Sequence, residues 1–204
     1  PCPLRWPRWQ KAGWNNAEKI EYTNLADMAV EGMNAGTAQV YAPAFTNYVE
    51  DIYVGYKYYE TAAQEGAIDY DKTVQYPFGY GLTYGTAEVI SAAYDQKSKK
   101  VSYEIVNHSD RAVEETVQVY KKNRTSKWEV RNTVLCGFAK VCLAPGETRQ
   151  GEIQLDEYAF TVVNDQGKRV QDGSDYLLYV GTHGPDKRSE ELTGTKAIAL
   201  DIKF

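Results

Sequence analysis

The chain has 204 residues, of which 43% are hydrophobic and 25% are charged, an ordinary composition for a soluble globular protein. Its net charge of −5 is spread along the chain without a basic stripe, which argues against nucleic acid as a partner. No apolar run approaches the ~20 residues that span a bilayer, so we expect no membrane partner. The length is enough for one full domain and a sizeable additional piece.

One feature of the composition is unusual, because 17 tyrosines accompany only 5 phenylalanines. Tyrosine joins a large apolar ring to a polar hydroxyl, which suits half-buried sheet faces, interfaces between domains and sugar-binding surfaces. Packing within sheets and interfaces is the simplest interpretation of this excess.

The first ten residues, "PCPLRWPRWQ", contain neither an initiator methionine nor the apolar stretch of a signal peptide. We therefore expect an internal boundary, a processed end or a truncated end at this point. The three cysteines do not form a disulfide framework. Cys136 and Cys142 flank one apolar segment that, if extended, separates them by ~20 Å, too far for a disulfide. We expect buried free thiols, which favour a cytoplasmic location.

Residues 1–86 form an irregular leader with no sustained periodicity. Within residues 24–33 the apolar positions recur near helical spacing and Asn24 can serve as the N-cap, which predicts at most a short helix. The later segment "EDIYVGYKYYET" fits two patterns. A helix would place Ile52, Tyr56 and Tyr59 on one face, whereas a strand would place Ile52, Val54, Tyr56 and Tyr58 on one face. We favour a short helix.

Residues 87–204 show the clearest pattern of the chain. Apolar and polar residues alternate with the period of two that a half-buried strand requires. The segments with this alternation are "KVSYEIVN" (100–107), "ETVQVYKK" (115–122), "ETRQGEIQL" (147–155), "DYLLYVGT" (175–182) and "KAIALDIKF" (196–204).

Turn residues separate these segments. "NHSDR" (107–111) is rich in turn-forming side chains, "APGE" puts Pro145 and Gly146 at the centre of a type II turn, and "NDQGK" (164–168) suits a hairpin. About seven short strands in about 115 residues predict a two-sheet β-sandwich of the fibronectin type III or immunoglobulin kind. The expected protein is mainly β, with the sandwich at 87–204 and an irregular, partly helical leader at 1–86. The antibody type is excluded because its cysteine pair and strand tryptophan are missing.

No catalytic site is visible in the residues themselves. The two histidines, His108 and His183, both sit in turn-like sequence, where histidine is usually a surface residue. No cysteine and histidine spacing resembles a zinc site, and neither a phosphate-binding glycine loop nor a G-x-S-x-G motif occurs. The sequence therefore predicts no catalytic residue, no metal and no cofactor. Two glycosylation sequons, at Asn107 and Asn123, matter only in a secreted protein.

Several motifs, taken together and in order, resemble the C-terminal portion of glycoside hydrolase family 3, the β-glucosidase family. The resemblance covers about residues 48–204. The segments that resemble the end of its second domain are "EDIYVGYKYYET" (50–61) and "YPFGYGLTYGTAEV" (76–89). The segments that resemble its fibronectin type III-like domain are "VSYEIVNHSDRAVEETVQVY" (101–120), "LCGFAKVCLAPGET" (135–148), "LDEYAF" (155–160) and "DYLLYVG" (175–181).

The resemblance implies a part of an enzyme without its catalytic residues. The family's nucleophile is an aspartate of a TIM barrel and its acid/base is a glutamate of an α/β-sandwich domain, and neither has a counterpart here. Ser109 and Asp110 resemble the nucleophile motif most closely, but they lie in a predicted turn. A barrel of ~250 residues does not fit in this chain. We therefore expect an inactive accessory portion that packs on and stabilises catalytic domains, and no hydrolysis of aryl-glycosides by the chain alone.

The resemblance also gives a role to "VQYPFGYGLTY" (74–84), which would be the crossover between the two domains. Proline fixes the backbone and glycine permits sharp bends where side chains would clash. The residues that we expect at this interdomain joint are Tyr56, Tyr59, Pro77, Phe78, Gly79, Tyr80, Gly81 and Tyr84.

The expected partners are the missing catalytic domains or a second copy of the chain, with carbohydrate as a further option. The alternative function is a stand-alone carbohydrate- or protein-binding sandwich, and an unrelated adhesin-like sandwich is a third. If Tyr56, Tyr59, Phe78 and Tyr80 are buried against the sandwich or a partner domain, the accessory role is favoured; a flat exposed aromatic platform would favour binding. We expect 48–86 to pack on its own sandwich and 1–47 to be partly irregular, with a dimer contact as the alternative.

Overall fold

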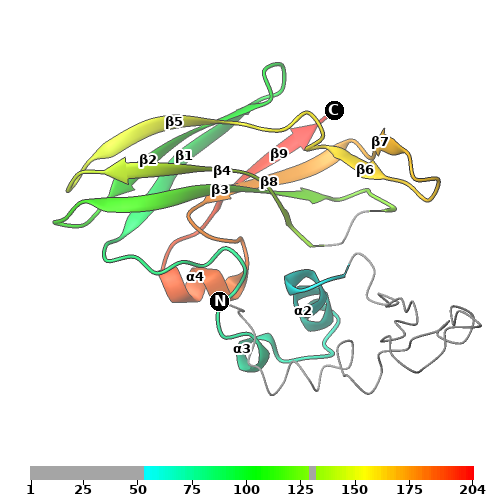
Figure 1. The fold of residues 1–204 in the computed structure, drawn as a ribbon, viewed down its shortest axis with the longest axis horizontal. Helices are drawn as coiled ribbons and strands as arrows, with labels where there is room; N and C mark the ends of the chain where they lie inside the picture. Colours follow the sequence, from blue (N-terminus) through cyan, green and yellow to red (C-terminus); the bar gives the residue numbers. More distant parts are fainter. Residues whose placement is uncertain (1–52, 129–131) are drawn as a thin grey trace, which may run out of the picture.

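The computed structural model describes residues 53–128 and 132–204, so the helix predicted within 24–33 lies outside the described residues. Figure 1 shows a β-sandwich with the helices gathered on one side of it. Within the part of the chain that is described, none of the helices has the length and apolar character needed to cross a membrane.

Two antiparallel sheets form the sandwich, as the alternation predicts. The first sheet has the order β1-β2-β5, and the second has the order β4-β3-β8-β9. A short hairpin, β6-β7, stands beside them. In chain order the strands are β1 (Ala87–Asp95), β2 (Lys100–Asn107), β3 (Val113–Asn123), β4 (Val134–Leu143), β5 (Thr148–Gln154), β6 (Thr161–Val163), β7 (Arg169–Gln171), β8 (Asp175–Gly181) and β9 (Ile198–Lys203).

The five alternating segments of the sequence correspond to β2, β3, β5, β8 and β9. Their inward residues meet between the sheets, as Ile105 of β2, Val119 of β3 and Leu178 of β8 show, each 0% exposed. Burying a side chain of this size contributes about 1.5–3 kcal/mol relative to leaving it in water. The core therefore follows from a period of two repeated on several strands.

The turns also agree with the sequence. Glu147 N–H donates to the Ala144 carbonyl at 3.1 Å, and Gly146 has a φ of 67°, which makes "APGE" a type II turn. In the β6-β7 hairpin, Asn164 N–H donates to the Lys168 carbonyl at 2.9 Å. The predicted turns at 144–147 and 164–168 are therefore confirmed.

The tyrosine-rich segment before the sandwich is helical, as favoured over a strand. Helix α2 (Tyr56–Gln64) buries Tyr59 and Ala62, which are three residues apart and therefore share a face. A second short helix, α3 (Tyr70–Thr73), starts at Asp69, whose side chain accepts a hydrogen bond from Lys72 N–H at 3.3 Å.

One helix inside the sandwich region was not predicted. Helix α4 (Lys187–Thr193) lies between β8 and β9, capped by Asp186, which accepts a hydrogen bond from Ser189 N–H at 2.8 Å. Gly194, with a φ of 75°, ends it. The capping residues can be recognised in the sequence, but the alternating segments on either side of them predict only strands for this region.

The expectation of buried thiols is wrong for Cys142. Cys136 and Cys142 both remain thiols, as predicted, but Cys136 is half-buried and Cys142 is exposed. Cys142 lies between the buried Val141 and Leu143 of β4, and the pleat turns every second side chain outward.

Candidate interdomain joint and the pocket beside it

The outer face of β3 is buried, although a sandwich strand usually turns that face to water. Val117 and Val119 point into the core, and Gln118 and Tyr120 alternate with them on the other side. Gln118 is nevertheless only 8% exposed and Tyr120 only 2%. The residues that cover them come from the predicted joint, so the described part of the leader packs on its own sandwich.

Hydrogen bonds attach the joint to β3. The Gln118 side-chain amide donates to the Gly79 carbonyl at 2.8 Å and to the Thr182 carbonyl at 3.0 Å, and its oxygen accepts from the Tyr120 hydroxyl at 2.7 Å. Each bond adds about 0.5–1.5 kcal/mol, but leaving a buried partner unpaired costs about 1–3 kcal/mol. Gln118 therefore connects three segments that are far apart in the sequence.

Aromatic contacts continue this attachment to α2. The Phe78 ring stacks on Tyr56, with centroids 4.0 Å apart and planes within 8°, and meets Tyr120 edge-on at 6.5 Å. Offset-stacked and edge-to-face pairs are the favourable arrangements of aromatic rings. Phe78 thus lies between the helix and the sheet, and Pro77 beside it is buried.

The two glycines of the joint differ. Gly79 has a φ of 81°, and a Cβ there would collide with the Tyr120 hydroxyl and the Gln118 side-chain oxygen. Gly79 is therefore required by both its backbone and its surroundings. A Cβ at Gly81 would meet no atom within 4 Å, so the steric requirement expected there is absent.

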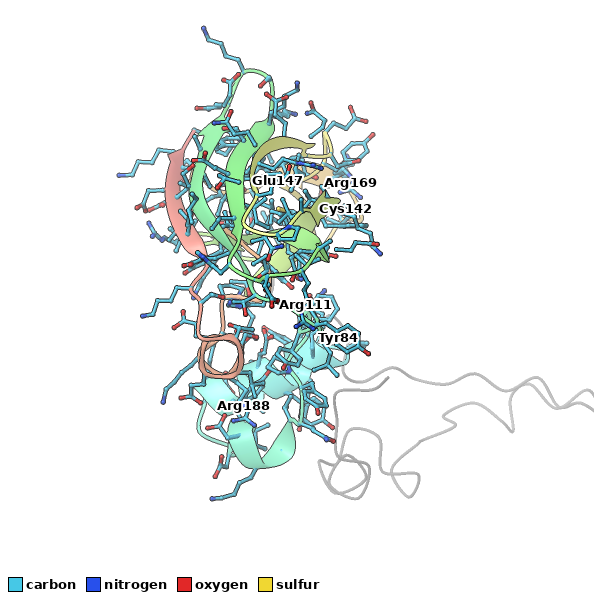
Figure 2. The ribbon with its side chains drawn as sticks, turned by 90° about the vertical axis from the view of Figure 1, so that its left-hand side faces the viewer. Tyr84, Arg111, Cys142, Glu147, Arg169 and Arg188 are labelled. Carbon is cyan, nitrogen blue, oxygen red and sulfur yellow. The ribbon has the colours of Figure 1, made fainter. Side chains whose placement is uncertain are left out.

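The end of the joint turns away from the sandwich. Tyr80 is half-buried and stacks on Tyr76 at 5.3 Å, whereas Leu82 is 84% exposed and Tyr84 is 95% exposed. Figure 2 shows Tyr84 at the level where the strands give way to the helices. Tyr84 therefore does not pack on its own sandwich, unlike Phe78, which meets Tyr120 of β3.

Asn132, 2% exposed, supports α2 from the segment before β4. Its side-chain amide donates to the Thr61 hydroxyl at 2.7 Å and to the Lys57 carbonyl at 3.3 Å. Sequence reasoning singled out neither Asn132 nor Gln118 as a site residue. A polar residue gives no local signal that a distant segment will cover it.

A carboxyl group lies within this junction. Burial, with the nearby Asp186 as a smaller cause, raises the pKa of Glu60 to about 8. Burial and then the Glu60 charge raise the pKa of Tyr56 to about 12. Both shifts disfavour negative charge between α2 and the sandwich.

The prediction of a surface position is wrong for His183, which is 1% exposed; His108 is exposed as expected. His183 Nδ1 lies 2.6 Å from the Gly184 carbonyl, and Nε2 lies 3.1 Å from both the carbonyl and the hydroxyl of Thr195. The segment that holds α4 folds over the end of β8 and encloses the ring, which the turn-like local sequence does not reveal.

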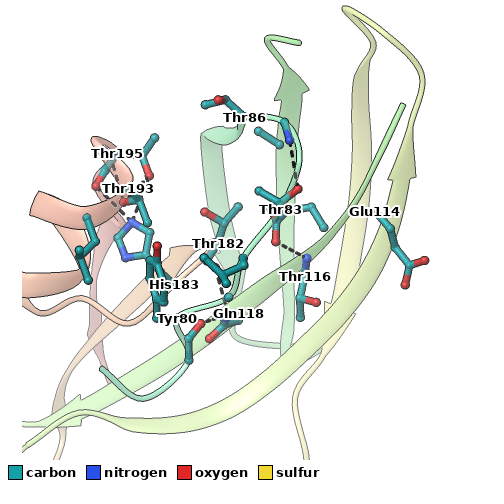
Figure 3. A pocket seen from close by; sticks show the side chains of 17 residues that line it. Tyr80, Thr83, Thr86, Glu114, Thr116, Gln118, Thr182, His183, Thr193 and Thr195 are labelled. Atoms are coloured by element: carbon teal, nitrogen blue, oxygen red, sulfur yellow. Dashed lines mark hydrogen bonds between the residues drawn. The ribbon is translucent and has the colours of Figure 1, made fainter. Parts of the chain in front are cut away.

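A pocket of about 510 Å³ opens beside the joint, within the size range typical of small-molecule sites. Its walls come from residues 79–87, the start of β3, and the segment 182–195. Threonines from all three segments surround it (Figure 3). Among the described residues, no group of three histidine, cysteine or acidic side chains could hold a metal ion, here or elsewhere.

The two sequon asparagines are structural in the folded chain. Asn107 is 1% exposed and donates to the Arg111 and Ala144 carbonyls at 2.8 and 2.9 Å. Asn123 is 7% exposed and donates to the Asp172 carbonyl at 2.8 Å. Neither amide is available for a glycan in this fold.

Known proteins are similar to this chain over most of its length. The profile of the fibronectin type III-like domain matches residues 115–184. An exo-α-(1→6)-L-arabinopyranosidase of Bifidobacterium longum is 34% identical over 76% of this chain and 19% of the relative. A β-glucosidase of Kluyveromyces marxianus is 36% identical over 71% of this chain and 18% of the relative.

A solved structure, the family 3 glycoside hydrolase β-glucosidase of Bifidobacterium adolescentis, is 30% identical with a TM-score of 0.61. The match covers 77% of this chain and 22% of that one. This chain therefore spans about a fifth of the length of the proteins that it matches.

Proposed function

Because this chain corresponds to the C-terminal portion of a glycoside hydrolase family 3 enzyme, including the fibronectin type III-like domain, we propose that it is the non-catalytic accessory portion of such an enzyme. In this role it packs on the catalytic domains and stabilises them. The β-glucosidase type is the proposed type of the whole enzyme, since relatives with that name match most of this chain.

The observation that carries the proposal is that residues 77–84 contact the sandwich at one end and present apolar side chains to solvent at the other. Phe78 and Gly79 are held against β3, which makes this stretch rigid. A few residues later Leu82 and Tyr84 present their side chains to solvent. Large apolar side chains at the surface lose the free energy of burial unless another surface covers them. A rigid stretch with an apolar outer edge is suited to docking a neighbouring domain.

The alternative, a stand-alone binding module with an aromatic platform, is less well supported. Tyr59 is 1% exposed, and Tyr56 and Phe78 are half-buried and stacked on each other. Side chains used for internal packing cannot offer their flat faces to a polymer. The inward direction of these rings favours the accessory role.

A chimaera tests the proposal. Residues 53–204 replace the matching segment of the Kluyveromyces marxianus β-glucosidase, and its melting temperature and its hydrolysis of p-nitrophenyl β-glucoside are measured. We expect an active enzyme that is destabilised by the double substitution Leu82→Ser and Tyr84→Ser. The same pair should leave the melting temperature of the isolated chain almost unchanged, because both side chains are exposed there.

The control is Phe138→Ser, which removes an exposed ring of β4. An active chimaera that the double substitution leaves as stable as the control would place the docking surface elsewhere. The isolated chain should hydrolyse no aryl-glycoside; turnover that disappears when one of its own carboxylates is substituted would contradict the accessory role.

A further inference from the structure

Of the two side chains proposed for docking, Leu82 lines the pocket beside the joint and Tyr84 does not, so most of its lining is left for another role. The pocket lies between the joint, the first residues of β3 and the segment that carries α4 (Figure 3). These three segments are joined by the Gln118 side chain, whose amide binds the Gly79 and Thr182 carbonyls. The pocket is therefore preformed, so a ligand would not have to order its walls.

The charges of the pocket exclude most classes of ligand. Among the described residues that line it there is no lysine or arginine, so these walls offer anions such as phosphates no counter-charge. Glu114 pairs with Lys140 at 2.9 Å, and Figure 3 shows its side chain directed away from the others. Glu115 accepts a hydrogen bond from Thr116 N–H at 2.8 Å, and a single carboxylate is too little for a metal ion.

The hydroxyl groups divide into two sets. The Thr193 hydroxyl donates to the Ser189 carbonyl at 2.8 Å, and Thr195 lies against His183, so these two are part of the wall. Within the described residues, the hydroxyls of Thr86, Thr116 and Thr182 make no hydrogen bond to the protein, although all three residues line the pocket. Each can donate one hydrogen bond and accept others from a ligand.

Apolar surface is also present, on the side of the joint. Tyr80 lines the pocket, and its ring stacks on Tyr76. Leu82 lines it too and is 84% exposed. A molecule with hydroxyls on its edge and C–H groups on its face would match both kinds of surface, and a purely apolar molecule would leave the threonines unpaired.

We propose that this pocket binds a neutral monosaccharide, with Thr116 and Thr182 as hydrogen-bonding residues and Tyr80 and Leu82 against the ring. The site would give the sandwich a sugar contact of its own, and it requires no catalytic domain to form.

The experiment uses the whole chain labelled with ¹⁵N and titrated with D-glucose. We expect saturable shifts confined to the amides of 79–87, 114–118 and 182–195, with a Kd on the order of 1 mM for a ligand of this size. The double substitution Thr116→Val and Thr182→Val removes two hydroxyls at constant volume and should weaken binding about tenfold. Thr148→Val, at an exposed position of β5, is the matched control and should bind as the parent does.

Three results would overturn the proposal: no saturable shift in these segments, equal affinity in the double variant, or the same shifts with inorganic phosphate. The amide spectrum of the double variant shows whether it is folded. If it is not, Thr86→Val, at an exposed position, replaces it, with weaker binding expected and unchanged binding contradicting the proposal. Failure of the chimaera to dock would leave this titration unaffected, so the two proposals fail separately.

Discussion

The sandwich and the joint are stabilised in different ways. Between the sheets, residues such as Ile105, Val119 and Leu178 are fully buried and apolar, and each supports its neighbours. In the joint, one edge-on ring contact, between Phe78 and Tyr120, and the hydrogen bond from Gln118 to the Gly79 carbonyl attach residues 77–80 to β3. The sandwich is stabilised by apolar area that many residues bury, whereas the joint is held by the contacts of a few residues. We therefore expect changes in the core to lower the stability of the chain more than changes in the joint, and four measurements test this order.

The largest effect is expected in the core. Leu178→Ala removes a fully buried side chain from β8 and should lower the free energy of unfolding by about 2–5 kcal/mol, because it leaves a cavity. Chemical denaturation measures this value. Leu82→Ala is the matched control: the same atoms are removed at a position that is 84% exposed, and the change should be close to zero. Equal losses at both positions would contradict the contrast between core and joint.

The next effect comes from removing the leader. A chain that begins near Gly85 loses the contact of Phe78 with Tyr120, and we expect it to be less stable by about 1.5–3 kcal/mol. It should still unfold in a single cooperative transition, because the two sheets remain complete. Thermal unfolding followed by circular dichroism shows whether the truncated chain has this cooperative transition. An unfolded truncated chain would mean that the leader belongs to the core and that the predicted division at residue 86 is wrong.

A smaller effect is expected when Gln118 is replaced. Gln118→Leu leaves the Tyr120 hydroxyl and the Gly79 carbonyl without their partner and should cost about 1–2 kcal/mol. Hydrogen exchange adds a local measurement, because Tyr80 N–H donates to the Pro77 carbonyl at 3.2 Å. That amide should exchange faster in the variant.

Gln150→Leu, on the exposed face of β5, is the control for this substitution. Exchange of the Tyr80 amide at an unfolded rate in the parent chain itself would show that the joint needs further domains to become ordered. Such a result would remove the joint from the folded unit altogether.

The smallest effect depends on pH. The unfolded carboxyl of Glu60 has a pKa near 4.5, and burial raises the folded value to about 8. Between these values only the unfolded state releases the proton, so the stability that this group contributes is full below about 4.5 and is lost as the pH rises to about 8. Glu60→Gln abolishes this titration. Because Glu60 is partly exposed and water screens its charge, only part of this shift should appear as stability, and the variant should gain about 1 kcal/mol relative to the parent between pH 5 and pH 8.

Unfolding by denaturant is measured at several pH values for the parent and for the variant. The contributions of the other titrating groups cancel in the difference between the two free energies of unfolding. A difference that stays constant with pH would show that Glu60 titrates normally in the folded chain.

Much of the fold was determined by local sequence. The alternation in β2, β3, β5, β8 and β9, the proline and glycine of the 144–147 turn and the spacing of Tyr59 and Ala62 in α2 all act over a few residues. Strand pleat, turn geometry and helical periodicity impose such patterns directly, so the patterns can be recognised without knowing what packs on them. The motifs that resemble family 3 enzymes are of the same local kind.

Tertiary structure alone decided which outward-facing residues are covered. In the sequence, Gln118, Asn132 and His183 are polar residues of a strand face, a loop and a turn, yet distant segments bury all three. Tyr84 belongs to the same aromatic tract as Phe78, yet one is 95% exposed and the other lies between α2 and β3. Whether an outward-facing side chain is buried depends on which other segment of the chain packs over it. For the same reason the pocket, whose three walls come from residues 79–87, 114–118 and 182–195, existed only once the chain was folded.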